Sequence, residues 1–198
     1  MRTAKTVLTV IQERGKQKKP IERVYKLLFN RELYLNAYAK LYPNNGAMTK
    51  GVTDETVDGM SIQKIDRMIE ILREEKYQWK PARREYIKKK NGKKRPLGIP
   101  VWGDKVLQEV MRQILEAYYE PQFSEHSHGF RPNRGCHTAL QEIQVWKGTR
   151  WFIEGDISQY FDTIDHKILL EILARNIHDG RFIRLVSNML EAGYLEEW

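Results

Sequence analysis

The sequence predicts an α+β fold, in which helices surround a small amount of β structure. Apolar residues recur at helical spacing through most of the first 80 positions and again from residue 103 onward. Between these regions, "RREYIKKKNGKKRPLGIP" places Asn91-Gly92 between two extended arms, which favours a β-hairpin. The apolar stretch "RWFIEGD" predicts one more strand. Helices first, and strands mixed with helices later, are typical of the α+β class.

The N-terminal elements are expected to be helices joined by turns. Residues 1–14 have an amphipathic pattern, and a second helix is expected to run from residue 21 to 41. The stretch 42–51, "YPNNGAMTKG", predicts a loop because proline, asparagine and glycine favour turns. Ser61 is expected to cap the N-terminus of a third helix.

The elements after the hairpin follow from the same periodicity. A long helix is expected at 103–119, and Pro121 is expected to end it. The remaining expected elements are a helix at 134–147, a strand that ends at Asp156, and helices at about 165–175 and 179–191.

The charge favours a polyanionic partner. The chain has a net charge of +8 and a pI near 9.5, and lysine or arginine bound to phosphates releases condensed counterions. The positive charges cluster in two blocks, which are Lys16, Lys18 and Lys19, and then Lys88, Lys89, Lys90, Lys93, Lys94 and Arg95. No apolar run approaches the roughly 20 residues that span a bilayer, so no membrane partner is expected.

The single cysteine excludes two classes of protein. One cysteine cannot form an internal disulfide framework or a zinc cluster of several thiolates. Cys136 is expected to be a small buried side chain, and a reducing cytoplasm is the expected compartment.

The basic hairpin has two interpretations, a solvated charged ribbon or a clamp for phosphates. Arg83 and Lys89 are six residues apart, so they share one face of a strand. A two-residue turn would send Arg95 to the opposite face. A three-residue loop that ends with Gly92 at positive φ would instead pair Ile87 with Arg95. We predict the three-residue form, which brings the three basic residues to one face.

The stretch "SHGFRPNRGCHTAL" predicts an ordered loop that leads into a helix. Its histidines lack the spacing of zinc ligands. Arg131 and Arg134 suit a nucleic-acid backbone, with Phe130 packed beneath the backbone or stacked on it.

The acidic stretch "EGDISQYFDTID" separates into two kinds of carboxylate. Asp162 and Asp165 are expected to be turn and cap residues for the next helix. Asp156 at the end of an apolar strand is less natural as a cap, and strand-end carboxylates commonly hold magnesium against a phosphate. A two-metal phosphoryl-transfer site needs further carboxylates, because both ions must be held about 3.5–4 Å apart.

Three motifs in this order, "RPLGIP", "SHGFRPNRGCHTAL" and "WFIEGDISQYFDTIDH", resemble those of the reverse transcriptases, or maturases, of group II introns. The stretch "AYAKLYPNNGAMTKGVTDETVDGMS" is also similar to the N-terminal extension of that family. The resemblance covers about residues 20–198 and implies a right-hand polymerase. It implies a helical N-terminal extension at 1–80, fingers at 81–150 and the beginning of the palm at 151–198.

The resemblance also implies a function, namely RNA-templated DNA synthesis with Mg²⁺ in a bacterial cytoplasm, with intron RNA, an RNA template, a DNA primer and dNTPs as partners. Asp156 and the Ile157 carbonyl would bind metal, and Phe161 would be the steric gate against a 2′-hydroxyl. The three converging hairpin residues would hold the triphosphate. The loop at 42–51, including Lys50, would cover the template, and the basic N-terminal helices would bind intron RNA.

One departure from the family pattern matters. The family's second metal motif contains an Asp-Asp pair, and no Asp-Asp dipeptide occurs in these 198 residues. We therefore expect an N-terminal part of a larger enzyme that does not polymerise DNA or bind Mg²⁺ tightly by itself. An apolar patch over 165–195 is expected to be exposed and could support a homodimer.

Two other functions stay open at this point. The chain could be an autonomous module that binds intron RNA and assists splicing without nucleotide chemistry. It could also belong to a related bacterial reverse transcriptase of the retron, diversity-generating or CRISPR-associated type, although the long N-terminal extension favours the intron type.

Overall fold

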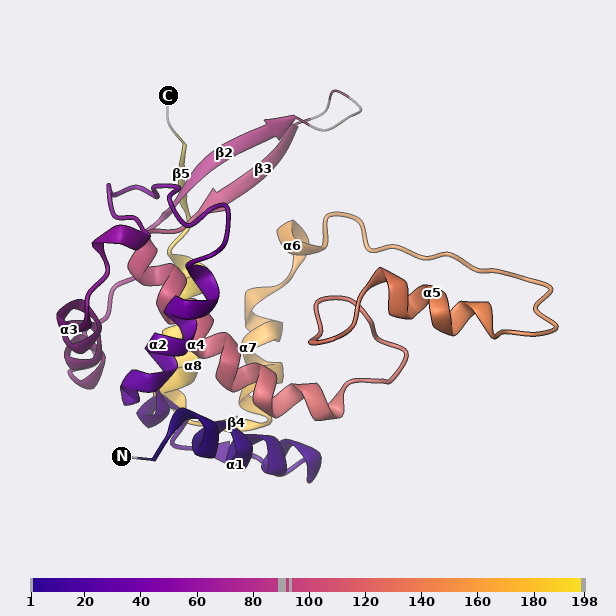
Figure 1. Cartoon of the computed structure of the whole chain (residues 1–198), viewed down its shortest axis with the longest axis horizontal. Coiled ribbons are helices and arrows are strands. Elements are labelled where there is room, and N and C mark those ends of the chain that lie inside the picture. The colour runs from indigo at the N-terminus through magenta and orange to yellow at the C-terminus, as the bar shows by residue number, and fades with distance from the viewer. Residues whose placement is uncertain (1, 89–91, 93, 197–198) are drawn as a thin grey trace.

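The computed structural model describes residues 2–88, 92 and 94–196, except for the side chains of Phe161 and Asp162. It confirms a mixed helix and strand fold (Figure 1). The helices are α1 (Ala4–Lys16), α2 (Arg31–Leu41), α3 (Ile62–Arg73), α4 (Trp102–Tyr119), α5 (Cys136–Gln144), α6 (Tyr160–Thr163), α7 (His166–Ala174) and α8 (Gly180–Glu191). The strands are β1 (Ile21–Glu22), β2 (Ala82–Lys88), β3 (Lys94–Ile99), β4 (Ile177–His178) and β5 (Tyr194–Glu196), and short 3₁₀ helices cover Val24–Phe29, Val57–Gly59 and Glu120–Gln122.

Helix α4 is the centre of the hydrophobic core. It has the predicted position and buries Val106, Leu107, Val110 and Ile114 completely. Removing a side chain of this size from water stabilises the fold by about 1.5–3 kcal/mol. Helices α1 and α2 pack against α4, and α7 and α8 contribute side chains to the same core. Figure 1 shows the arrangement of these helices.

The second predicted helix is wrong as a single element. Residues 21–41 form strand β1, a 3₁₀ helix and then α2. Arg23 has a left-handed backbone (φ 55°), which stops a helix that starts at Ile21. Asn30 then caps α2, because its side chain accepts a hydrogen bond from the Glu32 amide at 3.0 Å. Apolar spacing alone does not distinguish this break from a continuous helix.

The hairpin has the predicted register. Ile87 pairs with Arg95, and Gly92 has a φ of +79°. Strand β2 also pairs in parallel with β5, so that Arg83 lies opposite Leu195. A second, two-stranded sheet joins β1 to β4 through buried Ile21 and Ile177. These two parallel pairings connect the N-terminal and C-terminal halves of the chain.

The predicted strand that ends at Asp156 is wrong. Residues 151–157 are not assigned to a strand, and their large apolar side chains are exposed. They belong to residues 124–157, which we call the outlying arm because it extends from the helical body (Figure 1). A strand needs a neighbour for its backbone hydrogen bonds, and the described part of the chain does not supply one at this position.

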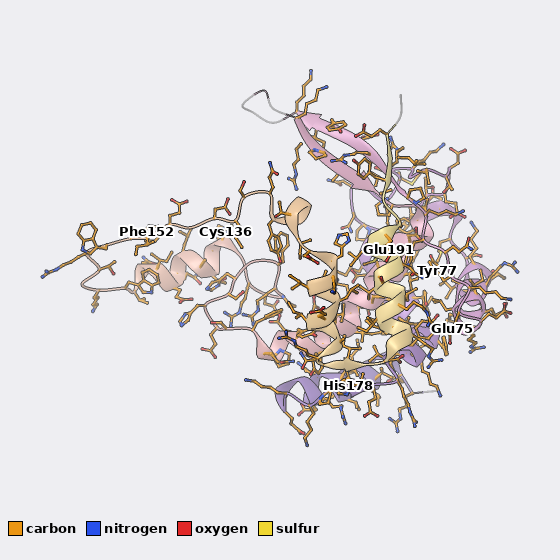
Figure 2. The ribbon with its side chains drawn as sticks, turned by 180° about the vertical axis from the view of Figure 1, so that it is seen from behind. Glu75, Tyr77, Cys136, Phe152, His178 and Glu191 are labelled. Carbon is orange, nitrogen blue, oxygen red and sulfur yellow. The ribbon has the colours of Figure 1, made fainter. Side chains whose placement is uncertain are left out.

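The outlying arm brings two more corrections. Helix α5 begins at Cys136, with Gly135 as its N-cap, and is shorter than the predicted 134–147 helix. Cys136 is exposed, contrary to the prediction of a buried thiol. Figure 2 shows Cys136 and Phe152 on this arm, far from the helical body that carries Tyr77 and Glu191.

Of the two aspartates predicted to cap the helix near His166, Asp165 is confirmed as a cap. The Asp165 carboxylate accepts hydrogen bonds from the amides of Lys167 and Ile168 at 2.8 and 3.1 Å and caps α7. Asp162 lies inside the short helix α6, before that cap.

Helix α8 buries Phe182, Leu185 and Val186, whereas Ile168 and Ile172 of α7 are 55% and 46% exposed. Within the expected patch, large apolar side chains are therefore exposed on α7 and at Tyr194 and Leu195 of β5, whereas the apolar side of α8 packs into the core.

Across the described residues, no helix is both long enough and apolar enough to span a bilayer.

Candidate nucleic-acid interface

Two arginines of the hairpin share one face of the sheet. Residues paired across strands lie on the same face, and Arg83 pairs with Ile99 while Arg95 pairs with Ile87. Because alternate residues of a strand also share a face, Arg83 and Arg95 lie on the same side. Lys88 and Lys94 pair with each other on the opposite side, and Lys88, Lys94 and Arg95 are exposed. The predicted contacts of Lys89, Lys90 and Lys93 fall outside the described residues.

Arg83 already has protein partners. Its Nε and Nη2 donate to the backbone carbonyl of Lys50 at 3.1 and 2.9 Å, and its guanidinium also contacts the Glu85 carboxylate. Only 16% of its side chain is exposed. To bind a triphosphate, Arg83 would have to exchange some of these hydrogen bonds. Its role in nucleotide binding stays a prediction, as does that of Arg95.

The opposite face of the hairpin carries a cluster that sequence reasoning missed. The Arg84 guanidinium lies 3.9 Å from the centre of the Tyr194 ring and 3.7 Å from the Glu196 carboxylate. The Tyr86 hydroxyl donates to Glu196 at 2.5 Å, and this hydrogen bond raises the pKa of Tyr86. The partners are about a hundred residues apart in the chain, so no local signal could have predicted the cluster.

The predicted template loop presents part of its surface to solvent. Tyr42 and Met48 are each 56% exposed, whereas Ala47 is buried. The Lys50 ammonium lies 2.8 Å from the Asp54 carboxylate, and its hydrogen bond lowers the pKa of Asp54. The contact of Lys50 with nucleic acid stays a prediction.

The N-terminal basic block lies at the end of α1. Lys16 forms an ion pair with Glu13 at 2.7 Å, and Lys18 and Lys19 are exposed. The Tyr118 hydroxyl of α4 donates to the Lys19 carbonyl at 3.0 Å, which ties this turn to the core. The backbone that carries these lysines is therefore tied to α4. Their contact with RNA stays a prediction.

The arginine loop of the outlying arm is held together by Arg131. Its side chain is 8% exposed, and its guanidinium forms an ion pair with Glu120 at 2.9 Å and donates to the carbonyls of Ser124 and Ser127 at 2.6 and 2.8 Å. Phe130 next to it is fully exposed with a φ of +56°. The geometry therefore suits stacking by Phe130, whereas Arg131 has a structural role in this arrangement.

The other end of this loop is fastened to α5. The Arg134 guanidinium donates to the Glu125 carbonyl. His128 contacts the Thr138 hydroxyl at 2.8 Å and the Glu142 carboxylate at 2.7 Å, and His126 contacts the same carboxylate. Hydrogen bonds from His128 and His126 lower the pKa of Glu142. A phosphate contact by Arg134 stays a prediction.

The predicted metal ligand Asp156 lies on an exposed segment without assigned secondary structure, next to exposed Ile157. Among residues 2–88, 92 and 94–196, no group of three or more histidine, cysteine, aspartate or glutamate side chains is arranged to hold a metal ion. Asp165 is used as a helix cap. The role of Asp156 as a metal ligand stays a prediction. The Phe161 side chain lies outside the described part.

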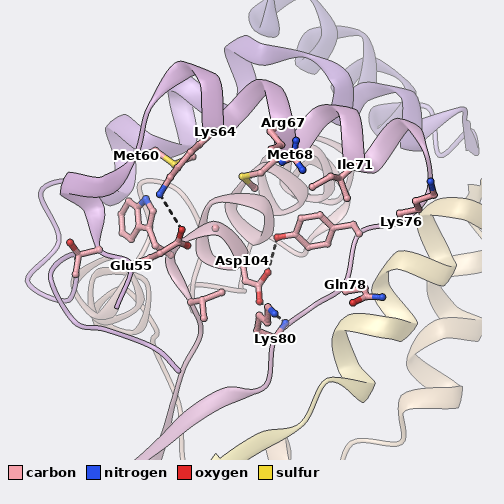
Figure 3. A pocket seen from close by; sticks show the side chains of 15 residues that line it. Glu55, Met60, Lys64, Arg67, Met68, Ile71, Lys76, Gln78, Lys80 and Asp104 are labelled. Atoms are coloured by element: carbon pink, nitrogen blue, oxygen red, sulfur yellow. Dashed lines mark hydrogen bonds and ion pairs between the residues drawn. The ribbon is translucent and has the colours of Figure 1, made fainter. Parts of the chain in front are cut away.

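A pocket of about 470 Å³ lies between α3 and the start of α4, apart from the predicted site residues (Figure 3). Its apolar wall includes Met68 and Trp102. The buried Asp104 carboxylate accepts hydrogen bonds from the Tyr77 hydroxyl at 2.7 Å and the Lys80 amide at 2.9 Å. Burial raises the pKa of Asp104 despite these hydrogen bonds. Figure 3 shows this network at the base of the pocket.

Comparisons with known proteins agree on one family. A family model described as "Reverse transcriptase (RNA-dependent DNA polymerase)" matches residues 87–196. The chain is 50% identical over 178 residues to the group II intron-encoded protein LtrA of Lactococcus lactis subsp. cremoris, a match that covers 89% of this chain and 30% of that protein.

More distant relatives are also named for introns. The chain is 46% identical over 202 residues to an uncharacterized 91 kDa protein in the cob intron of Schizosaccharomyces pombe, covering 98% of this chain and 25% of that protein. It is 36% identical over 93 residues to the mitochondrial nuclear intron maturase 1 of Arabidopsis thaliana, covering 46% of this chain and 13% of that protein. The chain spans less than a third of the length of each of these relatives.

Proposed function

Because the chain belongs to the reverse transcriptase family, we propose that it is the nucleic-acid-binding N-terminal part of a group II intron reverse transcriptase and maturase. The observation that carries this proposal is the hairpin register, which puts Arg83 and Arg95 on one face of a basic ribbon. The match to intron-encoded proteins favours the intron type over the retron, diversity-generating and CRISPR-associated types.

Each of the three predicted regions is assigned its own function in this proposal. Residues 1–80 serve as the helical extension that binds intron RNA, and residues 81–150 serve as fingers that contact the template, the primer and the dNTP. Residues 151–198 are the beginning of the palm. A-form RNA is bound mainly through its phosphates and 2′-hydroxyls, which suits exposed lysines such as Lys18 and Lys19.

The polymerase activity is proposed for a longer protein that supplies further carboxylates. There, magnesium would be held with the help of Asp156 and the Ile157 carbonyl, and Phe161 would exclude ribonucleotides. These 198 residues alone would not polymerise DNA, because their sequence has no Asp-Asp pair and the described side chains form no metal cluster. The second candidate function is that of a splicing cofactor, which binds RNA without nucleotide chemistry and therefore needs no metal cluster.

The proposal is tested by binding to an RNA template annealed to a DNA primer. Arg95→Gln removes an exposed cation from the proposed face, and Arg175→Gln, at the exposed end of α7, removes a matched charge elsewhere. Arg95→Gln should weaken binding several-fold and reduce the salt dependence by about one counterion. Equal effects of the two substitutions would contradict the assigned face.

A further inference from the structure

The loop at 42–51 is held from two elements by cationic side chains. Lys105 of α4 donates from Nζ to the Thr49 carbonyl at 3.1 Å and to the Gly46 carbonyl at 3.5 Å. Arg83 of β2 donates twice to the Lys50 carbonyl, at 3.1 and 2.9 Å. Three carbonyls of one short loop are thus bound by two cations that come from different parts of the fold.

The loop is also seated by close packing. Ala47 is buried in the core, and its carbonyl accepts a hydrogen bond from the Val57 amide at 3.3 Å. Gly51 lies directly against the chain before α4, because a Cβ at this position would lie 2.8 Å from the Val101 nitrogen and 2.9 Å from the Pro100 carbonyl oxygen. Any larger residue at position 51 must push the loop away from α4.

Lys105 is itself held in place. Its Nζ lies 5.9 Å from the centre of the Trp102 ring, and Trp102 is buried. Burial, followed by the nearby Arg83 guanidinium, lowers the pKa of Lys105. Two like charges brought together in a partly buried place repel each other, so the arrangement depends on the loop carbonyls that both of them bind.

We infer that Lys105 is a positioning residue, which together with Gly51 keeps the loop at 42–51 in one conformation before nucleic acid binds. Arg83 links the same loop to the hairpin face. The consequence for binding rests on the proposed function, in which this loop covers the template. A loop that is ordered beforehand loses less conformational entropy on binding, and this raises affinity without any new contact.

The experiment uses the full 198-residue chain and two measurements. Hydrogen–deuterium exchange reports whether the amides of residues 44–54 are protected, and fluorescence anisotropy reports affinity for an RNA template annealed to a DNA primer. The variants are Lys105→Met, Lys105→Arg and Gly51→Ala. Lys167→Met, an exposed lysine of α7, is the control for the loss of one positive charge.

Lys105→Met and Gly51→Ala should each speed exchange in the loop about tenfold, which corresponds to about 1.4 kcal/mol of lost local stability. Lys105→Arg should keep most of the protection, because a guanidinium can also donate to two carbonyls. Lys105→Met should weaken primer–template binding several-fold more than Lys167→Met. Circular dichroism confirms that each variant is folded.

Unchanged exchange in both Lys105→Met and Gly51→Ala would overturn the positioning role. If the loop of Lys105→Met exchanges faster but this variant binds the primer–template as tightly as Lys167→Met does, the claim that loop order serves nucleic-acid binding is overturned. A wild-type chain that binds no primer–template would overturn the proposed function, and the exchange measurement would then decide alone whether Lys105 holds the loop.

Discussion

Asp104 shows how one buried charge depends on its hydrogen-bond partners. Its side chain is nearly inaccessible to solvent, at 2%, and it accepts from the Tyr77 hydroxyl and the Lys80 amide. The network joins the chain after α3 to the first turn of α4. Because a carboxylate in a helix's first turn also interacts favourably with the helix dipole, Asp104 supports the start of the central helix.

Asp104→Ala should lower the free energy of unfolding by about 1–3 kcal/mol, since it leaves the part-buried Tyr77 hydroxyl and Lys80 amide without their acceptor. Urea denaturation followed by circular dichroism measures the change. Asp54→Ala, at an aspartate whose side chain is 93% exposed, should change it by less than about 0.5 kcal/mol. Equal losses would contradict a special role for Asp104.

The raised pKa of Asp104 has a defined pH dependence. A carboxyl group whose pKa is higher in the folded state binds protons more tightly there, so its contribution to stability falls as pH rises from the unfolded pKa, about 4, through the folded pKa. Relative to Asp104→Asn, the wild type should therefore lose stability as pH rises through this window. Urea midpoints of both proteins at several pH values measure this. A wild type that gains stability relative to Asp104→Asn as pH rises would refute the prediction.

At the scale of elements, local geometry and long-range pairing differ in how far the sequence predicts them. The hairpin register was predictable because a loop with Gly92 at positive φ determines which residues pair. The Ser61 and Asp165 caps were predictable for the same local reason. The strand at 151–156 was not, because a strand forms only where a neighbour accepts its backbone hydrogen bonds.

Gly92→Ala should destabilise the hairpin by about 1 kcal/mol, because a Cβ disfavours the left-handed backbone even where there is open space around it. Exchange of the β2 and β3 amides should become about fivefold faster. Gly155→Ala is the matched control, since this glycine also has open space around it and no positive φ. Unchanged protection in Gly92→Ala would mean that the strands, not the loop, determine the register.

At the scale of the whole molecule, contacts between distant segments could not be predicted from sequence patterns. The pairing of β2 with β5, the cluster of Arg84 with Tyr194, and the network of Asp104 with Tyr77 join residues that share no periodicity. The motifs predicted the family correctly. The roles assigned to Arg83 and Arg131 illustrate the limit, because the fold gives both guanidinium groups protein partners.

The exposed apolar face of α7 leads to a prediction about assembly. Ile168 and Ile172 are neighbours on one helix face and about half exposed, and burying such side chains against a second copy would be favourable. We expect light scattering to show association that increases with concentration, and Ile172→Glu to reduce it. A strict monomer at high concentration would rule this out.

The central claim, that these 198 residues recognise group II intron RNA, is tested most directly by filter binding. The chain is titrated against its intron RNA and against a scrambled RNA of the same length, over a series of salt concentrations. The account predicts a clear preference for the intron RNA that persists at physiological salt. Equal binding to both RNAs that collapses steeply with added salt would contradict it, because phosphate attraction alone would then explain the binding.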